Sequence, residues 1–315
     1  MKKTTIVIFT YKRAILLDVV LNFLFKNFKD ISYPVHIIYN HDNSHAASYK
    51  ILFKYWRKRG VKIYKREKIS LLKTPIHLLI RPLNFLWLLR WPDIFRNFNN
   101  FKSILENIVK KSKNDFITLV TDDQIFFRST KITDEIKMAL KLNNRSFYRF
   151  ISGKFFKDDH KLDKRIKILH STSKYFSWRC EDKYATASWK YRFTVDGTIY
   201  LKEDLLELIE PFIYHNPVTL EGIGLWESRF RRFFRIGHSA VLRTSAHYQI
   251  NNVQKLVINQ CSSFDNDFLM KKYLQGYRLK INPKEFLDIK YNILPKKIHL
   301  IHKRSNKRII IKENY

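Results

Sequence analysis

Short apolar runs alternate with helical patterns over the first 64 residues, and this alternation restricts the fold more than any other feature of the chain. Apolar residues recur at helical spacing in two segments, and runs typical of buried strands separate them. The expected elements are strands at Thr4–Thr10, Pro34–Tyr39 and Val61–Tyr64, and helices at Ala14–Phe28 and Ser48–Arg59, the second stopped by Gly60. This order predicts a parallel sheet with right-handed crossovers.

A later apolar run, Asp115–Phe126, carries two adjacent carboxylates, Asp122 and Asp123, where a buried strand is expected to end. Two like charges this close raise each other's pKa unless a positive group lies beside them. A bound divalent cation would supply that charge, and oxygen ligands suit Mg²⁺ or Mn²⁺. The other interpretation is a polar turn, and the run alone does not decide between the two.

Polar residues follow three of the expected strands at the point where each strand ends. These groups are Thr10–Arg13, Asn40–Ser44 and the pair Asp122–Asp123. In open α/β sheets, ligands bind beyond the carboxyl ends of the strands. We therefore expect the three groups to meet at one edge of the sheet and to form one binding site.

Charge is the strongest global signal, with 60 Lys and Arg against 28 Asp and Glu and a formal net charge of +32. It favours phosphorylated ligands, nucleic acid or an anionic membrane surface, but a lysine excess set by genomic base composition would look the same. No helix-turn-helix, RNA-recognition or zinc-finger signal supports nucleic acid. Charges and prolines make Ile69–Trp91 an interfacial segment or a core-covering insertion rather than a membrane span.

Several common kinds of site have no motif in this sequence. Cys180 and Cys261 have no paired spacing, which argues against a disulfide framework and a structural zinc site. The patterns HExxH, GxGxxG and GxxxxGKS/T are absent, so zinc-protease, dinucleotide-binding and P-loop chemistry are disfavoured. The first apolar run is too short for a signal peptide, and the cytoplasm is the expected compartment.

The rest of the chain predicts further elements and a tight turn at Asp196–Gly197. The expected helices are Ile132–Leu142, Lys202–Ile209 and a segment that Thr219 would cap and that would run to about Phe234. The expected strands are Ser146–Phe150, Tyr175–Arg179 and Trp189–Val195.

The polar groups suit an anionic ligand that bears a diphosphate. A divalent cation on Asp122 and Asp123 would bridge the two phosphates and stabilise a leaving group. Arg13 or Lys12 would lie against phosphate. Asp42, or its neighbour in the chain, Asn43, would hydrogen-bond the edge of a base.

Transfer to a hydroxyl also requires a carboxylate that accepts a proton. Asp196 lies on the expected turn, and Glu221 lies at the start of an expected helix, where the helix dipole favours the ionised form. Each also has a structural interpretation, Asp196 as a turn-former and Glu221 as a helix N-terminal acid. Arg149 would contact an anion or simply extend from a strand.

Several motifs resemble nucleotide-sugar glycosyltransferases of the GT-A fold, in particular bacterial family-2-like enzymes of surface polysaccharide synthesis. The resemblance extends from about Thr5 to Ile281. It departs from the family at Gln124, where the third acid of a DxD element is expected, and at Gly222, which follows Glu221 in place of a second acid. The motifs that carry it are Ile6–Arg13, Ile37–Ser44, Leu119–Phe126, Val195–Tyr200, Asn216–Glu221, Ile250–Gln254 and Leu274–Tyr277.

The resemblance implies an α/β, Rossmann-like GT-A fold: a central, mostly parallel sheet flanked by helices, with a helical, basic C-terminal extension. It implies a domain at 1–281, with a nucleotide-binding half (1–128) and an acceptor half (129–281), followed by an extension at 282–315. Nucleotide contacts are expected at Thr10, Tyr11, Arg13, Asp42 and Asp122.

The implied reaction is metal-assisted transfer of a sugar from a nucleotide-diphosphate sugar to a hydroxyl of a cell-surface or lipid-linked glycan. Mg²⁺ or Mn²⁺ would bind Asp123 and Asp122, Glu221 or Asp196 would be the base, and Arg149 would contact substrate. The enzyme would work at the inner, anionic face of the cell membrane without binding nucleic acid. The alternatives are a basic nucleic-acid-binding protein and an inactive glycosyltransferase-like scaffold.

Overall fold

The structure is a computed structural model of the chain. It describes residues 3–70, 92–142, 146–150, 164–185, 187–191, 193–222, 248–252, 257–259, 265–281 and 297–312. Most of the predicted Ile69–Trp91 segment and the predicted helix beyond residue 222 lie outside these ranges. Within them, no helix combines the length and the apolar character needed to cross a membrane.

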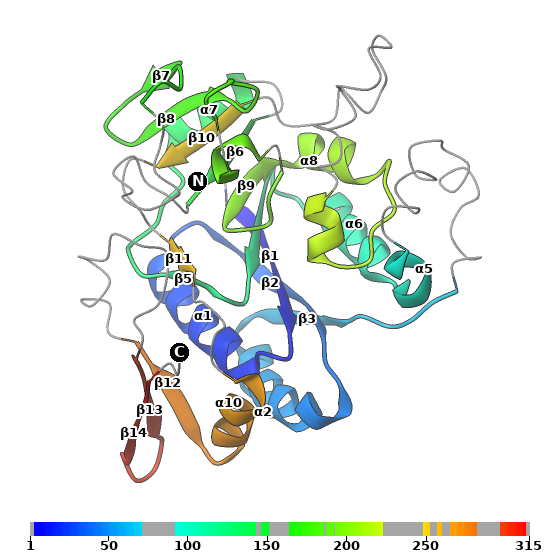
Figure 1. Cartoon of the computed structure of the whole chain (residues 1–315), viewed down its shortest axis with the longest axis vertical. Helices are drawn as coiled ribbons and strands as arrows, with labels where there is room; N and C mark the ends of the chain where they lie inside the picture. Colours follow the sequence, from blue (N-terminus) through cyan, green and yellow to red (C-terminus); the bar gives the residue numbers. More distant parts are fainter. Residues whose placement is uncertain are drawn as a thin grey trace.

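A mixed nine-stranded sheet forms the centre of the molecule, in the order β3-β2-β1-β4-β9-β6-β10-β8-β7 (Figure 1). Only β9 and β8 run against the direction of the other strands in this sheet. The strands are β1 (Thr4–Tyr11), β2 (Ile31–Asn40), β3 (Val61–Lys65), β4 (Phe116–Thr121), β6 (Ser146–Arg149), β7 (His170–Ser171), β8 (Tyr175–Arg179), β9 (Thr198–Leu201) and β10 (Tyr248–Asn252). The predicted α/β fold with a mostly parallel sheet is therefore confirmed.

Helices cover both faces of the sheet. Successive residues of β1 alternate between two cores: Ile6 and Ile8 pack on the side of α1 and α2, and Val7 and Phe9 pack on the side of α6 and α8. This two-sided burial explains the unbroken apolar run. The helices are α1 (Ala14–Asn27), α2 (Ala46–Trp56), α5 (Asp93–Asn97), α6 (Phe101–Lys111), α7 (Asp134–Leu142), α8 (Lys202–Ile209) and α10 (Asn266–Leu274), with 3-10 turns at η1 (Asn43–His45), η2 (Arg57–Arg59) and η4 (Ala187–Lys190).

The reversed strand β9 brings the second half of the chain to the edge where β1 and β4 end. It pairs antiparallel with β4, and Thr198 lies opposite Leu119. Because an antiparallel strand begins where its neighbour ends, the bend at Asp196–Gly197 lies beside the carboxyl end of β4. Gly197 has a φ of 52°, in the left-handed region that glycine adopts without steric cost.

One predicted strand, Trp189–Val195, is wrong. The chain forms η4, and the described residues between it and the Asp196 bend, 191 and 193–195, have no regular secondary structure. The carbonyl of Trp189 accepts a hydrogen bond from the indole of Trp178, and the backbone N–H of Val195 donates to Glu221. These side chains satisfy the backbone that a neighbouring strand would otherwise bind, so an alternating pattern does not produce a strand here.

Two smaller expectations also fail. Residues 217–222 are helical, but Asn216 rather than Thr219 caps them: Asn216 Oδ1 accepts the Thr219 N–H at 2.8 Å. The described part of the C-terminal extension is a β-hairpin, not a helix, formed by β13 (Lys297–His302) and β14 (Arg308–Lys312). This hairpin extends a sheet begun by β12 (Tyr277–Lys280), so the predicted boundary after residue 281 divides one sheet. A further two-stranded sheet joins β5 (Gln124–Phe126) to β11 (Val257–Asn259).

Candidate active site

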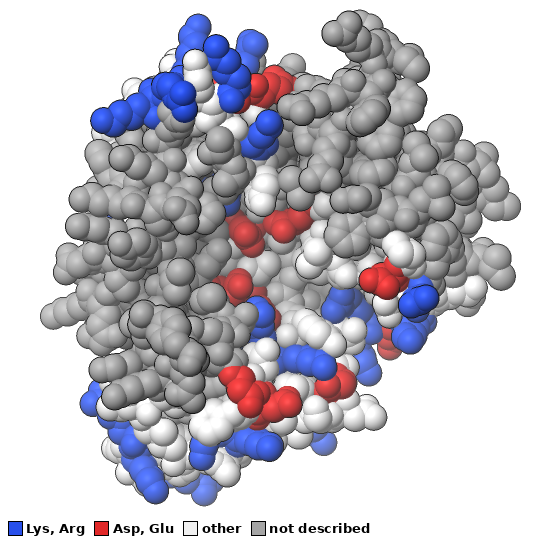
Figure 2. Space-filling view, viewed as in Figure 1, with Lys and Arg blue, Asp and Glu red and all other residues white. Residues whose placement is uncertain are grey.

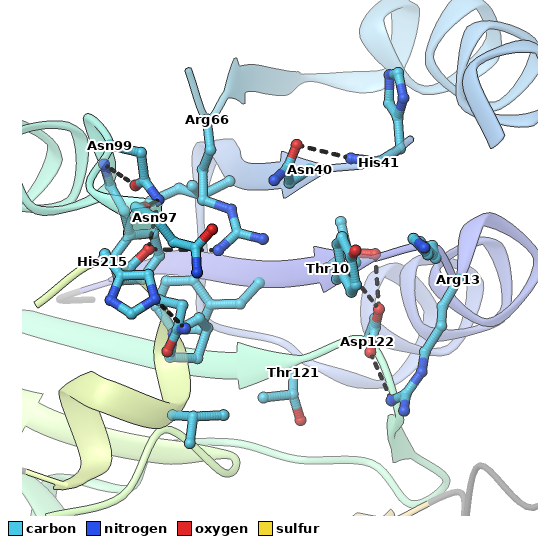
Figure 3. Close-up of a pocket in the computed structure, with 18 of the residues that line it drawn as sticks. Thr10, Arg13, Asn40, His41, Arg66, Asn97, Asn99, Thr121, Asp122 and His215 are labelled. Atoms are coloured by element: carbon cyan, nitrogen blue, oxygen red, sulfur yellow. Dashed lines mark hydrogen bonds and ion pairs between the residues drawn. The ribbon is translucent and has the colours of Figure 1, made fainter. Parts of the chain in front are cut away.

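A cavity of about 800 Å³ lies at the carboxyl edge of β1, β2 and β4 (Figure 3). Residues from all three polar groups that follow the predicted strands lie together at this cavity. Figure 2 shows carboxylate groups gathered in the hollow at the centre of this face. The lining includes Thr10, Tyr11, Lys12, Arg13, Asn40, His41, Thr121, Asp122, Asp123 and, from the second half of the chain, Asp196, His215 and Asn216.

Asp122 is buried and is bound by the end of β1. Its Oδ2 accepts hydrogen bonds from the Thr10 hydroxyl at 2.7 Å and the Tyr11 N–H at 3.2 Å, and its Oδ1 lies 3.4 Å from the Arg13 guanidinium. The Thr10 hydroxyl in turn lies 2.7 Å from the Tyr49 hydroxyl, which also accepts the Arg13 N–H. The single hydroxyl proton of Thr10 is donated to Asp122, so the Tyr49 hydroxyl donates to Thr10. These successive hydrogen bonds hold the Asp122 carboxylate in place.

The pKa of Asp122 is raised to about 7. Burial is the main cause and the charge of Asp123 adds to it, whereas Arg13 and the hydrogen bond from Thr10 oppose the shift. The positive group expected beside the acid pair is therefore present as Arg13, which also lies 3.6 Å from Asp123.

Asp123 is the member of the pair with an oxygen open to the cavity. Its Oδ1 accepts the Thr121 hydroxyl, and its side chain is 26% exposed against 6% for Asp122. Within the described ranges, no three His, Cys, Asp or Glu side chains gather into a metal-binding group. A divalent cation here would fit Asp123 together with oxygens of a bound phosphate, whereas Asp122 already binds protein donors through both oxygens.

A second acid, Asp196, lines the same cavity, and the charge of a buried arginine, Arg149, acts on it. Asp196, at the bend before β9, lines the wall, and burial raises its pKa to about 7, with further contributions from Glu221 and Asp123. Arg149, buried on β6, opposes this shift and is itself affected by the charges of Asp196 and Glu221. An acid with this pKa exists in both protonation states near neutral pH, which suits proton transfer.

Glu221 lies behind Asp196 and is not among the side chains that line the cavity. Its Oε1 accepts the Thr194 hydroxyl at 2.9 Å and the Val195 N–H at 2.8 Å. Burial raises its pKa, while these hydrogen bonds lower it. Glu221 therefore holds the segment that carries Asp196. Arg149, proposed from the sequence as a substrate contact, likewise lies behind the wall rather than in it.

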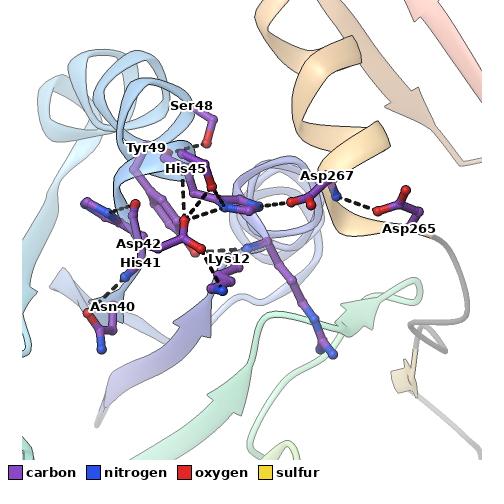
Figure 4. A network of polar contacts seen from close by, with 11 residues as sticks. Lys12, Asn40, His41, Asp42, His45, Ser48, Tyr49, Asp265 and Asp267 are labelled. Atoms are coloured by element: carbon purple, nitrogen blue, oxygen red, sulfur yellow. Dashed lines mark hydrogen bonds and ion pairs between the residues drawn. The ribbon is translucent and has the colours of Figure 1, made fainter.

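Asp42, expected to contact a base, points away from this cavity and into a local network (Figure 4). It accepts hydrogen bonds from Ser44 at 2.7 Å and from the backbone and side chain of His45, and it lies 2.7 Å from Lys12 Nζ. The hydrogen bonds from Lys12, Ser44 and His45 lower its pKa. Lys12 has a φ of 57°, and this left-handed turn sends Lys12 to Asp42 and Arg13 to Asp122.

Sequence reasoning missed a group of cavity residues that come from loops without a motif (Figure 3). Arg66 follows β3 and lies 3.5 Å from the His215 carbonyl, and the Asn99 amide donates to the same carbonyl at 3.0 Å. The Asn216 amide lies 2.9 Å from His215 Nε2. Burial, with Arg66, lowers the pKa of His215 to about 4, so its ring is neutral at pH 7. The position of Arg66 just after a strand was the one signal that could have identified it.

Of the comparisons with known proteins, only the comparison with solved structures gives matches. No protein-family model and no curated protein matches this chain. It is similar to the crystal structure of S. aureus TarS, with 12% identity over 87% of this chain and 39% of that one and a TM-score of 0.41. For TarS 1-349 in complex with UDP-GlcNAc, the identity is 15% over 64% of this chain and 46% of that one, with a TM-score of 0.32. For TarS 1-349 in complex with UDP, the identity is 13% over 80% of this chain and 58% of that one, with a TM-score of 0.37. The chain thus spans less than two thirds of these structures.

Proposed function

We propose that the chain is a glycosyltransferase that moves a sugar from a nucleotide-diphosphate sugar to a hydroxyl of a glycan. The observation that carries the proposal is that Asp196 lines the same cavity as Arg13 and Asp123. An acid able to take a proton and a cation able to hold phosphate thus share one cavity. Three of the motifs that resemble GT-A glycosyltransferases, Ile6–Arg13, Ile37–Ser44 and Leu119–Phe126, include these strand ends.

In the proposed reaction, the acceptor oxygen forms a bond to the anomeric carbon while the bond from that carbon to the phosphate oxygen breaks. The acceptor proton passes to Asp196, and the electron pair leaves with the nucleoside diphosphate. Arg13 stabilises the charge that develops on the leaving phosphate. A divalent cation, Mg²⁺ or Mn²⁺, would be held by Asp123 and would add Lewis-acid stabilisation of the same group.

In this proposal, Thr10 and Tyr11 hold Asp122 in position beside the donor through their hydrogen bonds. The nucleoside of the donor would lie near Asn40, His41 and Arg66. Arg149 neutralises Asp196 from behind. The acceptor would be a lipid-linked or cell-surface glycan at an anionic membrane surface in the cytoplasm, in keeping with the net charge of +32.

The test is a panel of nucleotide sugars offered to the purified chain with and without Mg²⁺ or Mn²⁺, with release of nucleoside diphosphate as the readout. Release, even slow release to water, supports the proposal. Calorimetry with the nucleoside diphosphates separates the remaining outcomes. Binding without release would indicate an inactive scaffold, and the absence of both would overturn the assignment of the cavity.

A further inference from the structure

Two segments without a single acidic residue meet on the side of the molecule where α2 ends. Residues 46–65, which contain α2 and η2, hold seven Lys and Arg, and residues 297–312, the C-terminal hairpin, hold six. In the view of Figure 2, blue groups lie along the lower edge, where Figure 1 places β13 and β14. The turn between these strands, residues 303–307, is exposed along its whole length.

Tyr55 marks the contact between the two segments. Its ring is 42% exposed, and two cations from different segments lie on it: Arg59 at 4.1 Å and Lys303 at 5.5 Å from the ring centroid. Burial, followed by the charge of Arg278, lowers the pKa of Lys303, and Arg59 contributes in the same direction. These cations repel one another, so an anion between them would stabilise the arrangement.

The nearby carboxylate does not fill that role. Asp18 is buried, accepts the Trp56 indole N–H at 2.8 Å and pairs with Arg278 at 3.2 Å. Among the residues that the structure describes, no ion pair joins Arg59 or Lys303 to a carboxylate. Of the carboxylates that the structure describes, none therefore takes the place of an external anion between the two cations.

The exposed face of α2 adds apolar character to this charge. Ile51 and Tyr55 lie one turn apart and are each 42% exposed, and Lys54 and Lys58 flank them. Apolar side chains bordered by basic ones are typical of a helix that lies at a lipid headgroup boundary. An aliphatic side chain such as Ile51 has no ring on which a base can stack, so the pattern fits lipid better than single-stranded nucleic acid.

We propose that this basic face, defined by Lys54, Tyr55, Lys58, Arg59, Lys303 and Lys307, docks on an anionic phospholipid surface, with a lipid phosphate held between Arg59 and Lys303. The proposal rests on the proposed membrane placement but not on sugar transfer. The Asn40–His41 wall of the cavity precedes the start of α2 in the chain, and the basic face lies at its other end. Eleven helical residues separate them by about 16 Å.

Vesicle co-sedimentation at constant ionic strength tests the proposal. The native chain should bind phosphatidylcholine vesicles that contain phosphatidylglycerol and should not bind pure phosphatidylcholine. Lys58→Gln, Arg59→Gln, Lys303→Gln and Lys307→Gln together should weaken binding by roughly several hundredfold, because each of the four basic residues near an anionic surface contributes about a factor of five. Replacement of the same three lysines by arginine should preserve it.

A matched control removes the same charge at the opposite end of the sheet: Lys164→Gln, Arg165→Gln, Lys167→Gln and Lys174→Gln, all exposed near β7 and β8. Arg165 also lies over a tyrosine ring, at 4.5 Å from that of Tyr184. This variant should keep most of the vesicle binding. Circular dichroism and thermal unfolding check that both variants are folded.

Three results would overturn the proposal: equal losses in the two variants, native binding to neutral vesicles, or tighter binding to single-stranded RNA that the basic-face variant also loses. Displacement of the protein from vesicles by inorganic phosphate, at matched ionic strength, would also overturn the proposal. It would indicate that the basic face binds a free anion and not a lipid surface. Donor turnover in the absence of vesicles should be the same in both variants. Its failure in the native chain would count against the proposed function alone.

Discussion

Asp122 and Asp196 are two buried or part-buried acids with raised pKa values, and each lies near an arginine, but their surroundings differ. Asp122 accepts hydrogen bonds from Thr10 and Tyr11 and pairs with Arg13, so both its oxygens are bound by protein. Asp196 lies at the cavity wall, and its counter-charge comes from behind. A raised pKa alone does not identify a reactive group, whereas a raised pKa in a side chain that lines a cavity makes that side chain a candidate.

The largest effect should come from Asp196, the acid at the cavity wall. Asp196→Asn removes the proton acceptor and should lower turnover of a nucleotide sugar on the order of a thousandfold, since general base catalysis contributes about 10²–10⁴-fold. Glu221→Gln is the matched control, because its amide oxygen still accepts from Thr194 and Val195. It should lose less than tenfold. A larger loss of turnover in the Glu221 variant than in the Asp196 variant would indicate that Glu221 is the base and that Asp196 is not.

The bound acid should govern stability instead. The folded-state pKa of Asp122 is raised above its unfolded value, so the folded chain holds an extra proton between about pH 4 and pH 7, and stability falls as pH rises through this window. The native chain should therefore lose free energy of unfolding between pH 4 and pH 8, and Asp122→Asn should not. Over this range the free energy of unfolding of the variant should rise relative to that of the native chain by on the order of 3 kcal/mol. Urea unfolding at several pH values measures it. If the free energy of unfolding changed with pH to the same extent in the native chain and in Asp122→Asn, the prediction would be contradicted.

Arg13 serves the bound acid and, in the proposed reaction, the donor phosphates. Arg13→Gln should weaken binding of a nucleoside diphosphate by about tenfold to a hundredfold, as expected for the loss of a charge-assisted contact. Arg165→Gln, an exposed arginine near the other end of the sheet, should leave the affinity unchanged. Calorimetry gives both values. Equal affinities in all three proteins would separate Arg13 from the donor site.

The pH dependence of turnover tests whether Asp196 is the base without any substitution. A base must be ionised, and the pKa of Asp196 is about 7, so the rate should fall about tenfold per pH unit below that value. Binding of donor to the free enzyme should change less over the same range. A rate that stays level down to pH 5 would exclude Asp196 as the base.

The smallest effect should come from the cap that supports the Asp196 side of the cavity. Asn216→Ala removes the acceptor for the Thr219 N–H and should lower the free energy of unfolding by about 1 kcal/mol. Asn216→Asp restores an acceptor at the same place and should recover most of it. Thermal unfolding measures both variants, and an unchanged midpoint for the alanine variant would show that the cap contributes nothing.

The sequence predicts one half of the molecule better than the other. From Thr4 to Lys65 the expected helices and strands occur, because continuous apolar runs and helical spacing report burial on both sheet faces and on one helix face. Trp189–Val195 fails because an alternating pattern is also produced by a loop whose backbone is bound by side chains such as Glu221. Patterns report burial and do not identify the hydrogen-bond partner.

The same limit applies to the site. The strand-end clusters indicated where the cavity lies, since that depends on strand direction alone. They did not show that Asp42 would turn to Lys12 and His45, because that depends on the left-handed backbone at Lys12. Arg66 and His215 belong to loops of irregular conformation, and only the three-dimensional structure brings them together.

The reversed direction of β9 affects the order in which the site assembles during synthesis. Arg13, Asp122 and Asp123 all belong to strands β1 and β4 or their ends, and these strands pair with each other directly. Asp196 joins them only when β9 pairs with β4, more than seventy residues later in the chain. The N-terminal part of a chain emerges first during synthesis. The repulsion between Asp196 and Asp123 can therefore arise only after β9 has been synthesised, when the residues of β1 and β4 are already present.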